Sequence, residues 1–463
     1  MKFSADWFKI LALIGFFAAL AFDGRLLVGS AIPGFHEYES FAVYLSDFFA
    51  VFLIGLNWRR LREVFFLLPR VGRGSLLVFI IFAAVSVFAA ASASLALYAL
   101  ARLVLAMLAG LAVAALVRER GALSLIASVF IAIVALEAAL GIAQFARQES
   151  IGLHFLGESP IAAGDPATSR ILIGGAYVVR AYGTFPHPNV FGAFLVLGLI
   201  ALCALWLRID WRGAIAAWRA DKPYLRIVLK TLGGSVLIAC LMSLVAFGLV
   251  LTFSRTAWII GAGAALLLAL FHMRTSWRRS LSLMVLLFAA SAFAVFPLRA
   301  FVAPRAADAV SDRAVTERIA YSRVGFELVK QHPLFGVGIG NQVLVGVQTG
   351  AYERAGIANT KPWLIQPAHN IYLLVASEIG MVGGLALLAF FIAALVGCVR
   401  TLFRRQHDDY DDDKQGKISR IVVIVMLSSL LLFAFVDHFP WTLVQGQLML
   451  WLTVGLVVGL AKA

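Results

Sequence analysis

About a dozen long apolar stretches constrain this chain more than any other feature of its sequence. Hydrophobic residues make up 62% of its 463 residues and charged residues only 14%, whereas a soluble domain is roughly half apolar and about a quarter charged. Because a helix needs roughly 20 apolar residues to cross the hydrocarbon core, we predict an all-α, polytopic integral membrane protein with about 12 transmembrane helices. The expected spans are 5–22, 40–57, 75–92, 95–117, 121–145, 188–207, 228–252, 256–273, 280–299, 370–399, 420–436 and 442–461.

Two features of the N-terminal spans affect the expected topology. The run from Trp7 to Phe22 resembles a secretory signal, but no A-x-A-like cleavage site follows it and many further spans do. We therefore expect a retained first helix. The third and fourth spans are divided only by the Ala-Ser-Ala-Ser stretch at 91–94. If these two spans formed one helix, every later segment would lie on the opposite side of the membrane.

Basic residues support this division because they gather in alternate loops, as they do on the cytoplasmic side of membrane proteins. With the N-terminus in the cytoplasm, the short outer turns at 91–94, 253–255 and 437–441 contain one basic residue, Arg255. The basic residues of the inner loops are Arg59, Arg60, Arg62, Arg70, Arg73, Arg118, Arg120, Arg208, Arg212, Arg219, Lys222, Arg226, Lys230, Arg274, Arg278, Arg279, Arg400, Arg404 and Arg405. We expect both termini in the cytoplasm, and we attribute the net charge of +14 to topology rather than to a nucleic-acid partner.

The whole chain, residues 1–463, is expected to form a single transmembrane domain with three longer connections. Two of them, 146–187 and 300–369, lie on the outer side, and the third, 400–419, is cytoplasmic. Connections of this length are where we expect structure outside the membrane.

The outer segment 300–369 is long enough to fold over the membrane surface. Within it, Ser311-Asp312 precedes a run of apolar and charged residues that ends before His332. This pattern predicts an amphipathic helix with an N-cap. The acidic run at 408–413 in the cytoplasmic loop is typical of a solvated charge run, and we assign it no catalytic role.

Cysteines and ionisable residues inside the apolar spans are expected to be structural. Glu378 and Arg102 lie within spans, where an ionisable group is costly and usually paired, so we expect them to brace neighbouring helices. The cysteines, which show no metal-like spacing, are Cys203, Cys240 and Cys398. We therefore expect no metal site and no disulfide.

Arg180 and Arg255 each lie where an apolar span meets the outer side. Arg180 is in VVRAYGTFPHPNVFG, just before the span that begins near Val190, and Arg255 is in LTFSRTAW. A guanidinium group offers a planar fork of donors to phosphate oxygens, so this pair suits a diphosphate-bearing lipid. For Arg255 the alternative interpretation is a snorkelling arginine beside the interfacial Trp258.

Five further residues at the same outer side could contact a substrate. His369, in QPAHNIYLL, is the candidate catalytic residue because an imidazole can accept and donate a proton near neutral pH; the alternative is a histidine that caps the helix start. Asn370 beside it and His332, in QHPLFG, are secondary candidates, although the latter setting is typical of a helix stop. His187 and Asn189 complete the set, and capping is the favoured role for Asn189.

Four motifs resemble those of the O-antigen ligase and O-antigen polymerase family. They are RAYGTFPHPNVFG (180–192), LTFSRTAW (251–258), HPLFGVGIGN (332–341) and AHNIYLLVASEIGMVGG (368–384), and they occur in the family's order. The resemblance covers the central and C-terminal two thirds of the chain. It does not separate ligase from polymerase.

The resemblance implies a GT-C-like glycosyltransferase of the bacterial inner membrane whose site faces the periplasm, so the two long outer segments are expected to be periplasmic. Such enzymes take a glycan from undecaprenyl diphosphate without a metal or other cofactor. In this family the motif arginines bind the donor diphosphate, matching Arg180 and Arg255. The histidine before the C-terminal helices is catalytic, matching His369, and the expected outcome is inversion at the anomeric carbon.

The ligase and the polymerase differ in the acceptor that receives the glycan. A ligase passes the glycan to lipid A–core, which is the function we expect, whereas a polymerase passes it to another lipid-linked repeat unit. The length of 300–369 favours the polymerase. A polysaccharide flippase or other transporter is the lesser alternative, because the chain shows no internal repeat and gathers its candidate residues at one surface rather than at the midplane.

Overall fold

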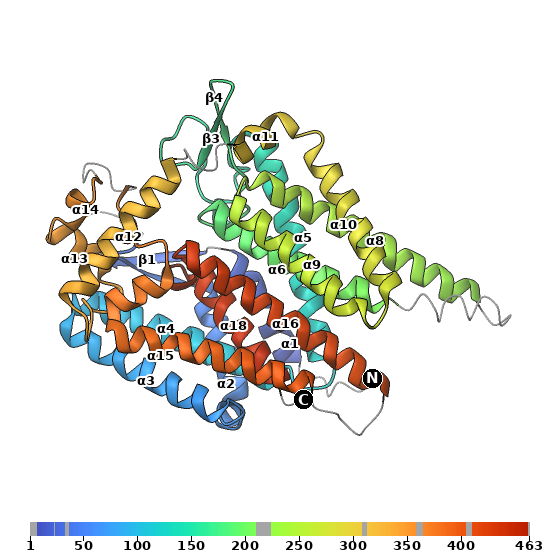
Figure 1. The fold of residues 1–463 in the computed structure, drawn as a ribbon, viewed down its shortest axis with the longest axis horizontal. Coiled ribbons are helices and arrows are strands. Elements are labelled where there is room, and N and C mark those ends of the chain that lie inside the picture. The colour runs from blue at the N-terminus through green and yellow to red at the C-terminus, as the bar shows by residue number, and fades with distance from the viewer. Residues whose placement is uncertain are drawn as a thin grey trace.

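Helices make up most of the protein, as Figure 1 shows for a computed structural model that describes residues 7–22, 24–32, 37–209, 224–307, 313–357, 364–403 and 410–461. Nine helices in these ranges are long and apolar enough to cross a membrane. They are α3 (Arg70–Ser86), α4 (Ala93–Leu116), α5 (Ala122–Arg147), α6 (Pro188–Arg208), α8 (Tyr224–Leu251), α9 (Arg255–Met273), α10 (Trp277–Val295), α15 (Ile371–Leu402) and α16 (Tyr410–Val436). The expected all-α, multi-pass membrane architecture is confirmed.

The remaining three expected spans also coincide with helices. The shorter apolar helices α1 (Trp7–Ala21) and α18 (Val444–Leu460) match the first and last of them. The expected span 40–57 is wrong at its start, because residues 40–44 form a strand and α2 (Leu45–Phe65) follows it. The side chain of Asp47 accepts a hydrogen bond from the Tyr44 amide at 2.9 Å, which fixes the start of α2 after the strand.

The third and fourth spans are separate helices, as expected. A 3-10 turn, η1 (Val87–Ala89), follows α3, and α4 begins after its N-cap residue Ser92. The hydroxyl of Ser92 accepts a hydrogen bond from the Leu95 amide at 3.3 Å. Because α3 and α4 are two helices rather than one, the later segments keep the sides of the membrane that the twelve expected spans give them.

Helix α6 lies at the centre of one half of the bundle. It packs against α5, α8, α9 and α16, and nearly all of its side chains are buried. In the other half, α15 packs along α3 and α18 packs along α4 (Figure 1). A helix that is apolar on all sides must be surrounded by protein or lipid. Because α6 is surrounded by other helices, its first residues lie among the ends of those helices.

Both outer segments contain ordered elements. Segment 146–187 contains η2 (His154–Leu156) and an antiparallel hairpin of β3 (Arg170–Ile173) and β4 (Ala176–Val179). Segment 300–369 contains α11 (Arg299–Ala307), α12 (Arg313–Gln331), α13 (Gln342–Gln348) and α14 (Ala351–Arg354). The amphipathic helix expected before His332 is α12, while its expected N-cap at 311–312 lies outside the described residues, as do Asp408 and Asp409 of the acidic run.

Two small elements were not expected. An antiparallel hairpin of β1 (Arg25–Ser30) and β2 (Ser40–Tyr44) connects α1 to α2. A single helical turn, α17 (Phe439–Thr442), lies between α16 and α18. Both lie in segments that the spans assign to the outer side.

Charged groups inside the spans brace neighbouring helices, as expected. Arg102 on α4 pairs with Asp47 on α2, and its guanidinium lies 4.8 Å from the ring centroid of Tyr44. Glu378 on α15 accepts a hydrogen bond from the indole of Trp441 on α17 at 2.8 Å. Each contact joins two segments that are distant in the sequence.

Gly380 interrupts α15 and lets the outer segment pack against it. Its backbone has φ 84° and ψ 164°, a combination that is essentially restricted to glycine. Next to it, the Met381 amide donates to the Pro333 carbonyl at 2.9 Å. A Cβ on Gly380 would lie 1.9 Å from the carbonyl oxygen of Leu334. The kink therefore anchors the loop that follows α12.

We predict that Gly380→Ala destabilises the protein by at least about 1–3 kcal/mol, because it combines an unfavourable backbone conformation with a steric clash. Gly384→Ala is the matched control, since its added Cβ would meet only atoms of Ala376 at 3.4 Å. Thermal unfolding of both variants in detergent measures the difference. Equal melting temperatures for the two variants would contradict this account of the kink.

Candidate functional site

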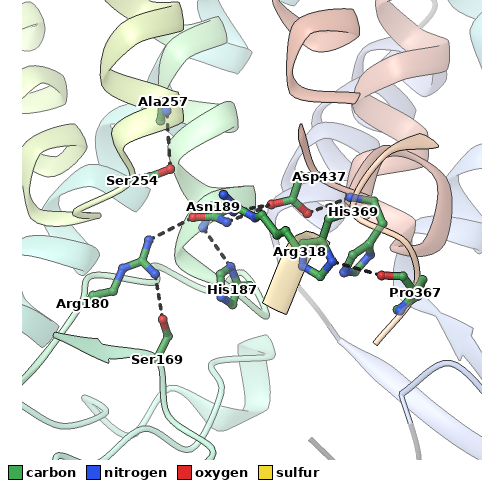
Figure 2. Close-up of polar contacts among 11 residues, drawn as sticks. Ser169, Arg180, His187, Asn189, Ser254, Ala257, Arg318, Pro367, His369 and Asp437 are labelled. Atoms are coloured by element: carbon green, nitrogen blue, oxygen red, sulfur yellow. Dashed lines mark hydrogen bonds and ion pairs between the residues drawn. The ribbon is translucent and has the colours of Figure 1, made fainter. Parts of the chain in front are cut away.

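Arg180 is a buried guanidinium that joins three segments of the chain, and Figure 2 shows its contacts with Ser169 and Asn189. It follows β4 and its side chain is only 6% exposed. Its Nε donates to the Thr252 carbonyl at 2.7 Å, and its two terminal nitrogens donate to Ser169 Oγ at 2.8 Å and Asn189 Oδ1 at 3.0 Å. The residue thus connects the β3–β4 hairpin, the turn between α8 and α9, and the start of α6.

The charge of Arg180 is poorly compensated. Burial, followed by the nearby positive charge of Arg305, lowers the pKa of Arg180 to about 9. The group is still protonated at neutral pH. Its bonds to described residues use three of the five N–H groups that a guanidinium carries. A bound anion would compensate the positive charge of Arg180 and would accept hydrogen bonds from its remaining N–H groups.

Asn189 carries the connection onward to Asp437. Its amide nitrogen donates to Asp437 Oδ2 at 2.8 Å, while its oxygen accepts from Arg180. The N-cap of α6 is His187, whose Nδ1 accepts from the Asn189 amide at 3.1 Å. The expected capping role of Asn189 is therefore wrong, because Pro188 at the first helical position makes His187 the cap and leaves the Asn189 side chain to bridge two charged groups.

His369 lies at the other end of this connection. Its Nδ1 is 3.0 Å from the Pro367 carbonyl, which can only accept a hydrogen bond, so the neutral ring carries its proton there and keeps a lone pair on Nε2. The ring stacks on Tyr321 at 5.1 Å and meets His438 edge-on at 4.6 Å between centroids. Burial, followed by the neighbouring His438, lowers the pKa of His369 to about 3. At neutral pH His369 is thus an uncharged base.

Asp437 is the acidic group that faces this histidine pair. Although burial opposes ionisation, His369 and His438 hold the pKa of Asp437 below its usual range. Its carboxylate also accepts from the His438 amide at 2.8 Å and lies 3.8 Å from a terminal nitrogen of Arg318. The carboxylate is thereby placed to stabilise a positive charge that forms on either imidazole.

The same three residues have the types and spacing of a metal site. One ligand atom each from His369, Asp437 and His438 lie within 4.8 Å of one another. However, the Asp437 carboxylate already accepts from Asn189, and the guanidinium of Arg318 lies against it. The positive charge of Arg318 opposes the binding of a divalent cation at this position.

Arg255 lies close to Arg180 in the fold. It is the first residue of α9 and follows the N-cap Ser254, whose hydroxyl accepts from the Ala257 amide at 3.4 Å. The carbonyl that Arg180 binds belongs to Thr252, three residues before Arg255. Arg255 therefore begins a helix directly after the turn whose Thr252 carbonyl Arg180 binds. Arg180 and His369 are connected separately, through Asn189 and Asp437.

The other two secondary candidates take no part in this cluster. Asn370 is the N-cap of α15, with Oδ1 accepting from the Leu373 amide and Nδ2 donating to the Phe435 carbonyl, both at 3.0 Å. His332 is exposed just beyond the end of α12, 11 residues after Tyr321, which corresponds to about 16 Å along a helix. Asn370 is structural, and His332 is remote from His369.

Three members of the cluster were not among the candidates derived from the sequence. Asp437 and His438 lie in the short turn between the last two spans, a position equivalent to that of Arg255 between its own two spans. That position alone could have identified them. Arg318 could not have been singled out in the same way, because α12 also carries Arg323 and Lys330 and the sequence does not show which of them faces the bundle.

A known protein family has a model that matches part of this chain. Residues 238–388 match the family model described as O-Antigen ligase. The match spans about a third of the chain and includes Arg255 and His369, so this part of the chain is similar to the O-antigen ligase family. No curated protein matches the chain.

We predict that His187 makes the fold sensitive to acid. Burial lowers the pKa of His187 to about 3, whereas the unfolded chain binds a proton near pH 6.5. As the pH falls from 6.5 toward 3, only the unfolded state is protonated and stability decreases. His187→Asn keeps a capping side chain without this titration, so between pH 7 and 5 it should lose about 1–2 kcal/mol less than the wild type.

Chemical denaturation in detergent at the two pH values measures this difference. The exposed His332 supplies the control variant His332→Asn, which should keep the acid sensitivity of the wild type. An unchanged pH dependence in His187→Asn would show that His187 is not held neutral by the fold.

Proposed function

We propose that this protein is a glycosyltransferase of the O-antigen ligase type, which transfers a glycan from undecaprenyl diphosphate to a hydroxyl group of lipid A–core. In this proposal the cluster faces the periplasm from the inner membrane, and both termini are cytoplasmic. The observation that carries it is the hydrogen-bonded connection from Arg180 through Asn189 to Asp437, which ends against His369. An anion-binding group and a neutral base are thus held in one network.

The donor diphosphate would bind to Arg180 and Arg255. Arg180 has N–H groups left for phosphate oxygens, and Arg305 and Arg318 add positive charge near it. Breaking the bond between the sugar and the phosphate places negative charge on the diphosphate. Cations fixed in a buried site stabilise such charge more effectively than they would in water.

The acceptor hydroxyl would be activated by His369. Nε2 takes the hydroxyl proton while the oxygen attacks the anomeric carbon, and the bond from that carbon to the diphosphate oxygen breaks with its electron pair leaving on the diphosphate. The configuration at the anomeric carbon is inverted. Asp437 stabilises the imidazolium ion that results, and the Pro367 carbonyl fixes which nitrogen acts as the base.

A transfer assay with purified components tests the function. Undecaprenyl-diphosphate glycan is offered with either lipid A–core or a second lipid-linked repeat unit as the acceptor. The ligase proposal predicts product with lipid A–core only. Chain growth on the second lipid-linked unit would instead identify a polymerase, and no transfer to either acceptor would contradict the proposal.

We predict that His369→Ala lowers the transfer rate by about 10²–10⁴-fold, the usual contribution of a general base, while donor binding persists. The donor site does not depend on the imidazole, so binding of the lipid-linked donor should change by less than about twofold. Turnover at the wild-type rate in His369→Ala would exclude this residue as the base.

We predict that Arg180→Ala and Arg255→Ala each weaken donor binding by about 10–100-fold, because each removes charge-assisted hydrogen bonds to phosphate. Arg147→Ala is the control, since Arg147 is exposed and pairs with Glu149 at 3.1 Å. Binding of the lipid-linked donor to detergent-solubilised protein provides the measurement. Unchanged affinity in both variants would remove the arginines from the donor site.

A further inference from the structure

A cavity lies beside the histidine pair, and its lining includes Pro367 and Thr442, which contact the two imidazoles. It has a volume of about 90 Å³ and is enclosed by β2, α4, the loop at 339–343, α17 and the start of α18. One water-sized centre needs roughly 10–15 Å³ of such volume, so the cavity has room for several polar groups.

The walls of this cavity contact both imidazoles. Pro367 lines the cavity, and its carbonyl fixes the Nδ1 of His369. Thr442 also lines it, and its hydroxyl lies 2.8 Å from the Nδ1 of His438. Tyr38, a third lining residue, meets the ring of His438 edge-on at 5.5 Å. A molecule in the cavity would therefore lie one residue away from each imidazole.

One buried acceptor, on a side chain that lines the cavity, has no donor among the described residues. Gln447 is 9% exposed, and its amide nitrogen donates to the Trp441 carbonyl. Its Oε1 is buried without a hydrogen-bond partner among the residues that the structure describes. Leaving such an oxygen unpaired costs about 1–3 kcal/mol, so a ligand with hydrogen-bond donors would be stabilised there.

The remaining lining groups indicate what kind of ligand this is. Aromatic side chains of Tyr38, Tyr44 and Trp441 form apolar walls. The carboxylate of Glu37 is paired with Arg25 at 2.7 Å and that of Glu378 accepts from Trp441 at 2.8 Å, and each oxygen has a second lone pair that can accept a hydrogen bond. The cation among the described lining residues, Arg102, is already paired with Asp47. Because Arg102 and Glu37 are both already paired, the described lining residues offer an acidic ligand no uncompensated positive charge, and the cavity suits a neutral ring that carries several hydroxyl groups.

We propose that this cavity is a subsite for one neutral pyranose ring of a glycan substrate. The assignment of that ring to a substrate rests on the proposed transferase function. Binding of the ring itself does not. Its hydroxyl groups would donate to Gln447 and Glu37, and its apolar face would lie on the aromatic walls. Because the cavity is next to Pro367 and Thr442, a ring bound there would place its neighbouring sugar at the imidazoles.

Direct binding of free sugars tests the subsite without any transfer reaction. Saturation-transfer NMR on the full-length protein in detergent would use glucose and N-acetylglucosamine as probes, with glucuronic acid as the acidic comparison. Ser40 lines the cavity on β2, so Ser40→Trp should fill it and abolish the signals of the neutral sugars, while Ser40→Ala keeps them. Signals that survive in Ser40→Trp, or stronger binding of glucuronic acid, would overturn the proposal.

Transfer kinetics then identify which substrate supplies the ring. Gln447→Met removes the unpaired acceptor and should raise the KM of one substrate by about tenfold with less change in kcat, since it removes a binding contact rather than the base. Thr453→Val, on the same helix but outside this cavity, is the control. A shift for the donor assigns the ring to the lipid-linked glycan, and a shift for the acceptor assigns it to the core oligosaccharide.

The two proposals fail in different ways. If neither KM changes in Gln447→Met while the wild type transfers glycan, the cavity is not a substrate subsite and the transferase proposal stands. If the wild type transfers nothing but binds neutral sugars in a manner that Ser40→Trp abolishes, the transferase proposal fails and the sugar site stands.

Discussion

The hydrogen bond between Asn189 and Asp437 joins the two halves of this protein at the point where its chemistry is expected. One amide side chain accepts from the buried guanidinium of Arg180 and donates to the buried carboxylate of Asp437. A buried charge is stable only when it is paired and hydrogen-bonded. The positions of α6, of the turn before α9 and of the α16–α17 junction thus depend on one another.

This network explains why a multi-helix membrane protein concentrates polar residues at a few helix ends. Inside the hydrocarbon, backbone groups must be satisfied within helices, so irregular segments and charged side chains collect where helices begin and end. Arg255, His369 and Asp437 all occupy such positions. The cavity lined by Gln447 also includes Pro367 and Thr442, which contact the Nδ1 atoms of His369 and His438.

The sequence predicted the spans well because their apolar length is a direct consequence of bilayer thickness. It also placed Arg180 and His369 at span ends, and the structure connects these two candidates through Asn189 and Asp437. The sequence-based prediction was wrong at the start of α6, where one residue determines which side chain caps the helix. Pro188 moved the helix cap from Asn189 to His187, and the partners of Asp437 come from elements far away in the sequence. Long-range partners of this kind have no local pattern.

The most direct test of the central claim is an experimental structure of the protein bound to a non-transferable analogue of the lipid-linked donor. The account predicts that diphosphate oxygens lie within hydrogen-bond distance of the Arg180 guanidinium and that the anomeric carbon faces Nε2 of His369. A diphosphate held elsewhere, with Arg180 and His369 on separate surfaces of the bound complex, would contradict it.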